Sequence, residues 1–186
     1  MKKPSLSAIE DQFNAAVRAE EDGDSTTAAK LYKKIISAHP QNALAYVNLG
    51  TILFHRKQFP AAAALYHKAI EVDPSYTMGH FNYANALKEM GQYVEARQAY
   101  ENAIESDPKH ADSHFNLALA YERDDELPKA LRHWKAYLQL DNGSHWSAVV
   151  RSEIGIIIAL TQIQVVAKTE TPARTFGPKS PLFLAK

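Results

Sequence analysis

Asparagine recurs at a fixed interval of 34 residues, at Asn14, Asn48, Asn82 and Asn116. A carboxamide carries two N–H donors and one acceptor oxygen, so it can pair with the groups of a peptide backbone. A column of carboxamides could therefore hold an extended polypeptide by its main chain without selecting its side chains. Asparagine is a mediocre helix former, so helix propensity does not explain four copies. Two explanations stay open: contact with a ligand, and duplication of a residue that bonds the backbone of its own fold.

The histidines and clustered carboxylates point to packing and capping rather than to a metal centre. His110 and His114 are four residues apart, a spacing that can bind zinc on one helix face. No third ligand lies nearby in the sequence, so we predict no metal site and a packing role for His114 and for His80, one period earlier. The acidic run Asp124–Glu126 is expected to precede a helix and to interact favourably with its dipole.

No motif in the chain proposes catalysis. We find no phosphate-binding glycine loop, no Gly-x-Ser-x-Gly elbow and no zinc-protease motif, and therefore predict neither a cofactor nor enzymatic activity. The chain has no cysteine, which excludes disulfides and thiolate chemistry and suits a cytoplasmic location. No apolar run follows the first lysines, so we predict no export signal. Its 21 basic and 21 acidic side chains cancel, so nothing favours nucleic acid or a membrane as partner.

The spacing of the asparagines belongs to a repeat that covers about three quarters of the chain. Shifting the sequence by 34 residues aligns Pro40, Pro74 and Pro108, and also Ala28, Ala62, Ala96 and Ala130. Within each period, helical apolar spacing occurs in two stretches separated by turn residues such as Gly91. We predict an all-α chain of four helix hairpins at residues 9–42, 43–76, 77–110 and 111–144. An amino-terminal tail (1–8) precedes them, and a capping helix (145–168) and an extended or disordered tail (169–186) follow.

The two faces of the first helix of each hairpin differ in character. When each unit is counted from position 1 to 34, position 24 is always aromatic, as Tyr32, Tyr66, Tyr100 and Trp134. Small residues at positions 8 and 20 allow two helices to approach closely. At about 100° per residue, positions 4, 7, 8 and 11 share one side, and positions 2, 5, 6, 9, 12 and 13 lie on the other. The second side carries the asparagines, including Asn85 at position 9, beside an apolar column that contains Phe81 and Phe115.

This pattern resembles the tetratricopeptide repeat, whose signature places Leu-Gly, a tyrosine, an alanine, an aromatic residue and a proline at these positions. The resemblance implies a right-handed α-solenoid of antiparallel hairpins, with an inner groove lined by the first helix of each unit. The steps Val47-Asn48-Leu49-Gly50 and Phe115-Asn116-Leu117-Ala118 are similar to those of the O-linked N-acetylglucosamine transferases, whose repeat superhelix holds peptide with an asparagine ladder. The transferases' catalytic domain has no counterpart here, so only the binding mode carries over. The first unit departs most from the pattern, as terminal repeats often do.

These features predict a non-catalytic adaptor that binds an extended segment of another protein. Main-chain contacts are assigned to Asn48, Asn82, Asn85 and Asn116, with Asn14 as a weaker member, and side-chain contacts to Phe81 and Phe115. Charges at the groove positions sum to minus four, which favours a neutral or basic segment. They are Glu10, Glu20, Glu21, Glu89, Asp112 and Glu122 against Lys88 and Arg123. Positions 2, 5 and 6 carry no lysine or arginine, so the two-carboxylate clamp of some family members is not expected.

The segment from Ile154 to Ala167 carries no charge and is too short to span a membrane. We expect it to be buried in protein, with one face on the last hairpin and the other on a partner subunit or on the tail. The alternative function is therefore a self-assembling scaffold, a homodimer through residues 154–167. The β-branched residues of the segment 154–167 also permit a strand there. The basic tail after it is hypothesised to enter the groove of its own or a second copy, or to have no role.

Overall fold

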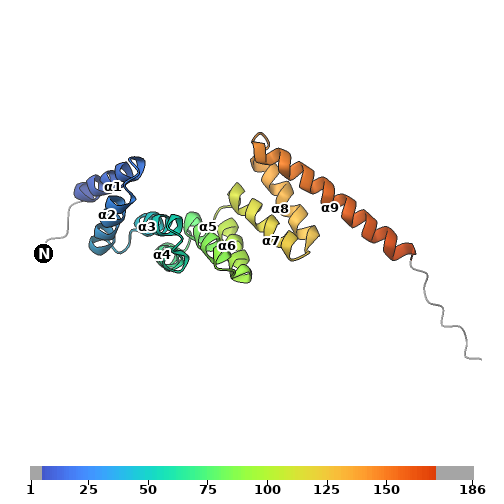
Figure 1. Cartoon of the computed structure of the whole chain (residues 1–186), viewed down its shortest axis with the longest axis horizontal. Coiled ribbons are helices and arrows are strands. Elements are labelled where there is room, and N and C mark those ends of the chain that lie inside the picture. The colour runs from blue at the N-terminus through green and yellow to red at the C-terminus, as the bar shows by residue number, and fades with distance from the viewer. Residues whose placement is uncertain (1–5, 171–186) are drawn as a thin grey trace, which may run out of the picture.

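The structure is a computed structural model that describes residues 6–170, with side chains for residues 9–162. In that range the chain forms helices and no strand, and successive pairs of helices stack as hairpins along the long axis (Figure 1). The prediction of an all-α solenoid of helix hairpins is confirmed. The helices are α1 (Leu6–Glu21), α2 (Ser25–Ala38), α3 (Ala43–His55), α4 (Phe59–Val72), α5 (Thr77–Glu89), α6 (Tyr93–Ser106), α7 (Ala111–Arg123), α8 (Leu127–Leu140) and α9 (His145–Glu170).

The hairpins share one geometry. The first helices of the second to fourth units occupy positions 1–13, and all four second helices occupy positions 17–30. Position 15 has a left-handed backbone in every unit, with φ of 77° at Gly23 and 76° at Gly91. Lys57 and Asp125 adopt φ of 59° and 58° at the same position, a conformation that a Cβ makes unfavourable by about 1 kcal/mol. Stacking therefore imposes the same turn where the sequence lacks glycine.

No hairpin has a core of its own. The buried side chains form three clusters, and each cluster draws residues from at least two successive units. The last cluster extends from the third and fourth units to Val150 and Ile157 of α9. The position-24 aromatics are at the centre of these clusters, since each is at most 2% exposed. Stability therefore resides between repeats, as expected for a solenoid.

Helices α3 and α4 approach closely at Gly50. A Cβ placed on Gly50, at position 8, would lie 2.7 Å from Cε1 of Tyr66, at position 24. Tyr66 is 2% exposed, so its ring has no open space to move into. The other units carry buried alanines at position 8, so the second unit is packed more tightly around its aromatic residue than they are.

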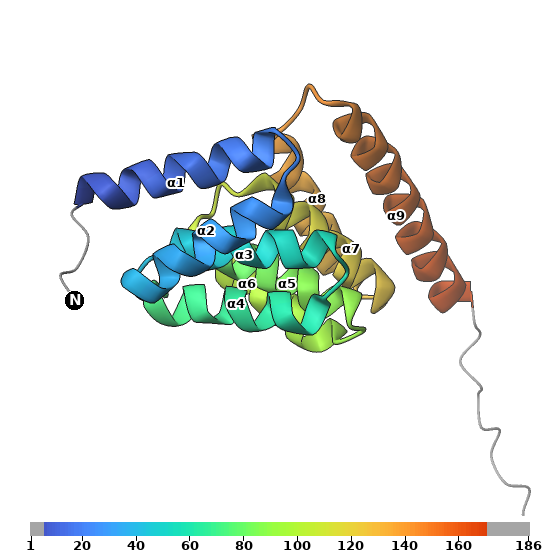
Figure 2. The ribbon, with the colours of Figure 1, turned by 60° about the vertical axis from the view of Figure 1, so that its left-hand side comes forward.

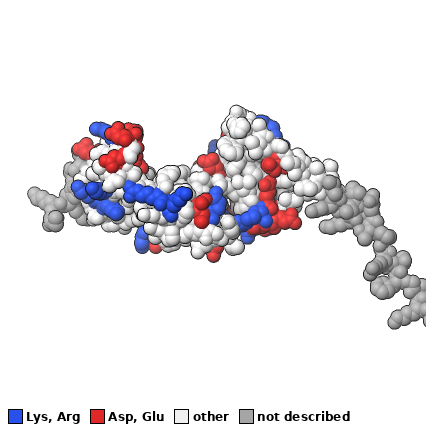
Figure 3. Space-filling model, in the orientation of Figure 1, with Lys and Arg blue, Asp and Glu red and all other residues white. Residues whose placement is uncertain are grey.

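Helix α9 contains the segment 154–167, for which the sequence predicts a capping helix and also permits a strand. It is helical throughout, which rules out the strand, but within the chain only one face is covered: Val150 and Ile157 are buried. Other large apolar side chains of the helix are exposed, namely Trp146, Val149, Ile156, Ile158 and Leu160. The helix projects beyond the stack (Figure 2), and from Ile154 to Gln162 it carries no charged residue (Figure 3). One face of the segment is covered by the last hairpin, as expected, and the second contact expected for it, with a partner subunit or with the tail, stays a prediction. No helix in the described range is long and apolar enough to cross a membrane.

Several predicted boundaries and caps also differ from the structure. Helix α1 begins inside the predicted tail 1–8, at Leu6, and α9 continues to Glu170, two residues past its predicted end at 168. The rest of the predicted tail 169–186 lies outside the described residues. Ser144 caps α9 as predicted, accepting a hydrogen bond from Ser147 N at 3.3 Å.

The acidic run Asp124–Glu126 does not cap α8 through its side chains. Glu126 stands at the cap position without a capping hydrogen bond. It pairs instead with Lys129 and with Arg97, at 3.4 Å from Arg97 Nη1, and Asp124 lies 2.5 Å from the same nitrogen. Arg97 belongs to the preceding repeat, so these carboxylates link two units instead of capping the amino terminus of α8.

We predict that Gly50→Ala destabilises the protein by about 1 kcal/mol. Overpacking against Tyr66 lowers the free energy of unfolding by about 1–3 kcal/mol. The higher helix propensity of alanine offsets about 1 kcal/mol of that loss. The matched control is Gly155→Ala in α9, where an added Cβ meets nothing within 4 Å. That variant should be as stable as the wild type or up to about 1 kcal/mol more stable. Urea denaturation followed by circular dichroism measures both, and equal effects at the two glycines would contradict the close-approach account.

Candidate peptide-binding groove

The surface opposite the packing side of the first helices is accessible along the stack. We call it the groove face and define it by positions 2, 5, 6, 9, 12 and 13 of α1, α3, α5 and α7. Positions 2 and 13 are exposed in all four units, and position 6 is exposed or half-buried in all four. Two cavities open on this face, one of about 400 Å³ between α1 and α3 and one of about 190 Å³ between α5, α6 and α7. The fold thus leaves most of the predicted ligand-facing positions accessible, but Val47, at position 5 of the second unit, is buried in the core.

The asparagines differ in how far the fold already uses them. Asn48 Nδ2 donates to Tyr32 Oη at 3.0 Å, and its oxygen accepts no hydrogen bond within the described residues. Asn85 Oδ1 accepts from Tyr100 Oη at 2.6 Å, which leaves its amide donors available. Asn116 is the most engaged, because Nδ2 donates to Asp112 O at 2.9 Å and Oδ1 accepts from Lys88 Nζ at 3.2 Å. The bond from Asn116 to a backbone carbonyl fits the structural explanation of the repeated asparagine. The amide groups that Asn48 and Asn85 leave unpaired within the described residues fit contact with a ligand.

Asn82 is the member of the column with the greatest free capacity. It lies half-buried on α5 and makes no hydrogen bond to any group in the described part of the chain. Its two donors and its acceptor therefore remain for a ligand or for solvent. Asn14 is exposed and lines the cavity between α1 and α3, together with Phe13 and Leu44.

The two phenylalanines proposed for side-chain contacts are partly used by the fold. Phe81 packs edge-on against His110, with ring centroids 4.9 Å apart, and is half-buried. Phe115 contacts Trp134 at 4.9 Å and Trp146 of α9 at 5.6 Å. Both rings are half-buried and so keep part of their surface accessible, and Phe115 also contacts the capping helix.

The cavity between α5, α6 and α7 contains residues that the sequence did not single out together. Tyr93 and Leu119 supply apolar surface, and Asn116 lies at its edge. Lys88 also lines it, and Arg123 lies over the Tyr93 ring, 3.9 Å from the centroid. Tyr93 opens α6, outside the groove positions of the first helices, so helical spacing along one helix could not have assigned it to this face.

The buried aromatics at position 24 also reach the groove face with their polar tips. Tyr32 Oη donates to Glu20 at 2.6 Å, and Trp134 Nε1 donates to Glu122 at 2.5 Å. Burial raises the pKa of the Glu122 carboxyl and, together with the Glu20 hydrogen bond, the pKa of the Tyr32 hydroxyl. The residues that hold the hairpins together thus also orient polar side chains on the groove face.

The predicted packing role of His114 is what the structure shows. His114 Nε2 lies 3.1 Å from the Pro108 carbonyl, which can only accept, so Nε2 carries the proton and Nδ1 of the neutral ring accepts from His133 Nδ1 at 3.0 Å. His110 is directed elsewhere, toward Ser113, whose backbone N–H it accepts at 3.2 Å. Within the described residues no three potential metal ligands lie together.

Stacked helix hairpins with an open polar face on their first helices define an all-α repeat protein of the kind that binds other proteins. Two models described as tetratricopeptide repeat match residues 11–77 and 65–98, and one described as TPR repeat matches residues 84–125. The chain belongs to the tetratricopeptide-repeat family. A search of curated proteins found no match.

Solved structures agree with this assignment of the fold. The crystal structure of MamA has a TM-score of 0.70 at 20% identity, covering 83% of this chain and 88% of MamA. A mutant O-GlcNAc transferase of Thermobaculum terrenum has a TM-score of 0.67 at 20% identity, over 75% of this chain and 27% of the transferase. The first TPR of Spaghetti (RPAP3), bound to the HSP90 peptide SRMEEVD, has a TM-score of 0.61 at 20% identity, over 64% of this chain and 98% of that domain. At these identities the likeness shows the fold alone.

We predict that the fold loses stability as the pH falls from about 6.5 to about 4. Burial lowers the pKa of His133 from the ordinary value of 6.5 to about 4, and burial also lowers the pKa of His114. In this window the unfolded chain binds protons that the folded chain does not, so protonation favours unfolding. Protonation of His114 at Nδ1 would also remove the acceptor for His133.

Urea denaturation at a series of pH values measures this effect. His133→Phe keeps an aromatic ring but removes one of the two histidines whose pKa is lowered. The stability of this variant should therefore depend less steeply on pH than that of the wild type. His145→Phe, a change at an exposed histidine at the start of α9, controls for the loss of one histidine elsewhere. Identical pH dependence in the wild type and His133→Phe would contradict the prediction.

Proposed function

We propose that this protein is a non-catalytic adaptor that binds an extended, neutral or basic segment of another protein along its groove face. The observation that carries the proposal is the asparagine column at position 6. Its members lie on the accessible side of the first helices, and Asn82 keeps its full hydrogen-bonding capacity. An extended main chain offers donors and acceptors at regular spacing, which carboxamides can match.

The charges on the groove face support a neutral or basic ligand. Glu20 and Glu122 accept hydrogen bonds from buried aromatics, Lys88 is directed at Asn116, and Arg123 pairs with Asp124 at 2.9 Å. The exposed carboxylates that remain are Glu10, Glu21, Glu89 and Asp112. They attract cationic groups and disfavour acidic peptides. No basic residue stands at positions 2, 5 and 6, so an acidic peptide such as that bound by Spaghetti is not the ligand we propose.

Replacement of Asn82 tests the proposal. Peptides selected on the wild type from a display library supply the probes, and fluorescence polarisation gives their Kd. Asn82→Ala should raise the Kd by about three- to tenfold, because a main-chain hydrogen bond is lost. The matched control is Gln139→Ala, which removes an exposed carboxamide from α8, outside the groove positions of the first helices. Unchanged Kd values for Asn82→Ala would count against the asparagine column as a binding element.

A second candidate function, a homo-oligomeric scaffold, is favoured by the exposed apolar face of α9. Ile156 and Leu160 are 49% and 45% exposed and lie four residues apart, so they share one face of the helix. An exposed apolar face of this kind is typical of an interface. We propose that this face pairs with its copy on a second chain, through residues 154–167.

Sedimentation velocity over a range of concentrations tests the scaffold. We expect a concentration-dependent dimer for the wild type and a monomer for the double variant Ile156→Glu, Leu160→Glu, because carboxylates are costly to bury in such an interface. Asn82→Ala, which alters the groove face alone, should still dimerise. A wild type that is monomeric at every concentration would exclude this function and leave the adaptor untouched.

A further inference from the structure

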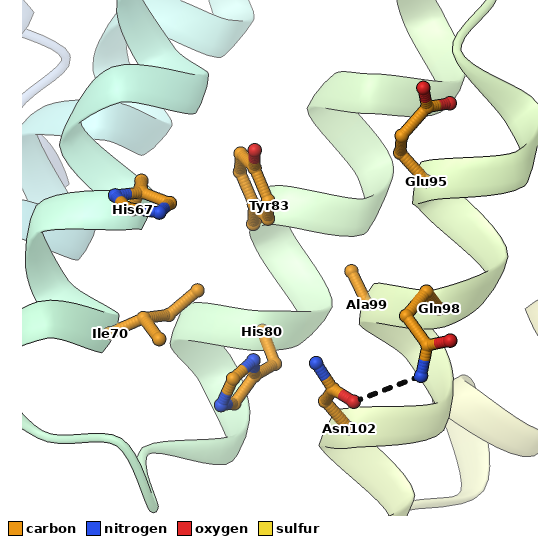
Figure 4. A pocket seen from close by; sticks show the side chains of 8 residues that line it. All are labelled: His67, Ile70, His80, Tyr83, Glu95, Gln98, Ala99 and Asn102. Atoms are coloured by element: carbon orange, nitrogen blue, oxygen red, sulfur yellow. Dashed lines mark hydrogen bonds between the residues drawn. The ribbon is translucent and has the colours of Figure 1, made fainter.

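A cavity of about 300 Å³ lies on the packing side of α5, away from the groove face, where α4, α5 and α6 meet. Figure 4 shows that the side chains of His80 and Tyr83 on α5 face Ala99 and Asn102 on α6 across it. His80 is 8% exposed, so its ring lies at the floor rather than at the rim. The function proposed above does not use this cavity.

His80 offers the cavity a single acceptor, its Nδ1. Its Nε2 lies 2.9 Å from the carbonyl oxygen of Pro74, which can only accept, so Nε2 carries the proton of the neutral ring. Nδ1 is then an acceptor. It receives no hydrogen bond from any group in the described part of the chain. A ligand that fits this floor must therefore bring a donor.

The fourth repeat shows which group donates to the equivalent acceptor, His114 Nδ1. His114 stands one period after His80 and makes the same bond, from Nε2 to the Pro108 carbonyl at 3.1 Å. There His133 lies beside it, with its Nδ1 3.0 Å from His114 Nδ1 and its ring stacked on Tyr121 at an interplanar angle of 17°. His133 occupies position 23 of its unit. The same position is leucine in the first two units and Ala99 in the third, so the third unit alone carries a bare methyl group there.

We propose that this cavity binds a neutral N–H-bearing heteroaromatic ring of the imidazole class, which donates to His80 as His133 donates to His114 one repeat later. The ring packs on Tyr83, because Leu87, the counterpart of Tyr121, is buried and does not line the cavity. The ring N–H donates to His80 Nδ1, and the ring plane packs between Tyr83 and the methyl group of Ala99. The source of the ring is either a free small molecule or a histidine side chain of a partner polypeptide.

The rim adds polar groups that can hold whatever carries the ring. Gln98 Nε2 donates to Asn102 Oδ1 at 3.2 Å, so the amide donors of Asn102 and the amide oxygen of Gln98 remain available. These are the groups that pair with a peptide main chain. The exposed carboxylate of Glu95 lies on the same helix, about one turn before Gln98 (Figure 4).

The test is an NMR titration of the full chain with imidazole at about pH 8, where free imidazole is neutral, in parallel with 1-methylimidazole, which has no N–H. We expect saturable shifts of the His80 and Tyr83 ring signals with imidazole, and binding at least about tenfold weaker with 1-methylimidazole, because one buried hydrogen bond is lost. A blocked histidine peptide is the third ligand. Tighter binding of the peptide than of imidazole identifies a partner side chain as the source, and equal binding identifies a small molecule.

The variant Ala99→His places a ring where His133 lies in the next repeat and should abolish imidazole binding with the fold retained. Val94→His, which adds a histidine at an exposed site of the same helix, should leave imidazole binding unchanged. The absence of saturable binding to the wild type, equal affinity for the two imidazoles, or undiminished binding to folded Ala99→His would each overturn the proposal. If Ala99→His does not fold, the comparison of imidazole with its methylated form on the wild type still decides.

Discussion

Burial of the aromatic side chain at position 24 is the interaction on which the rest of the structure depends. One helix hairpin is too small to enclose such a ring, so Tyr32, Tyr66, Tyr100 and Trp134 are buried only because a neighbouring unit covers them. Small residues at positions 8 and 20 leave room for each ring, and the fit is tight at Gly50, where an added Cβ would clash with Tyr66. The polar tips of these rings emerge on the groove face, where they bond Glu20, Asn85 and Glu122. The core of the solenoid therefore fixes side chains at the site.

This coupling explains why the asparagine column is uneven. Asn48 and Asn85 are each held by a tyrosine hydroxyl, Asn116 is held by Lys88 and its own helix, and Asn82 is held by nothing in the described chain. Carboxamides fixed by the fold present their remaining groups in defined directions and lose little freedom on binding, whereas a free one can adjust to the ligand. A groove with both kinds can bind a main chain firmly and tolerate different side chains, which suits an adaptor.

Much of the fold could be predicted from the sequence because its information is periodic. The 34-residue interval located the hairpins, the aromatic positions and the accessible side of the first helices. Features that depend on a neighbour in space were not predictable in this way. The pairing of Asp124 and Glu126 with Arg97, for example, joins two repeats. The partners of the asparagines, and the cavity left by Ala99, became visible only when side chains from three helices were placed together.

The most direct test of peptide binding by the asparagine column is a double-mutant cycle between Asn82 and the ligand backbone. One amide of a selected peptide is replaced by an ester, which removes a single N–H donor, and the ester is moved along the peptide. We expect one ester position to weaken binding to the wild type by about tenfold and to have no further effect on Asn82→Ala, because both changes remove the same hydrogen bond. Fully additive effects at every ester position would show that Asn82 does not contact the peptide main chain through such a donor, and would contradict the proposed binding mode.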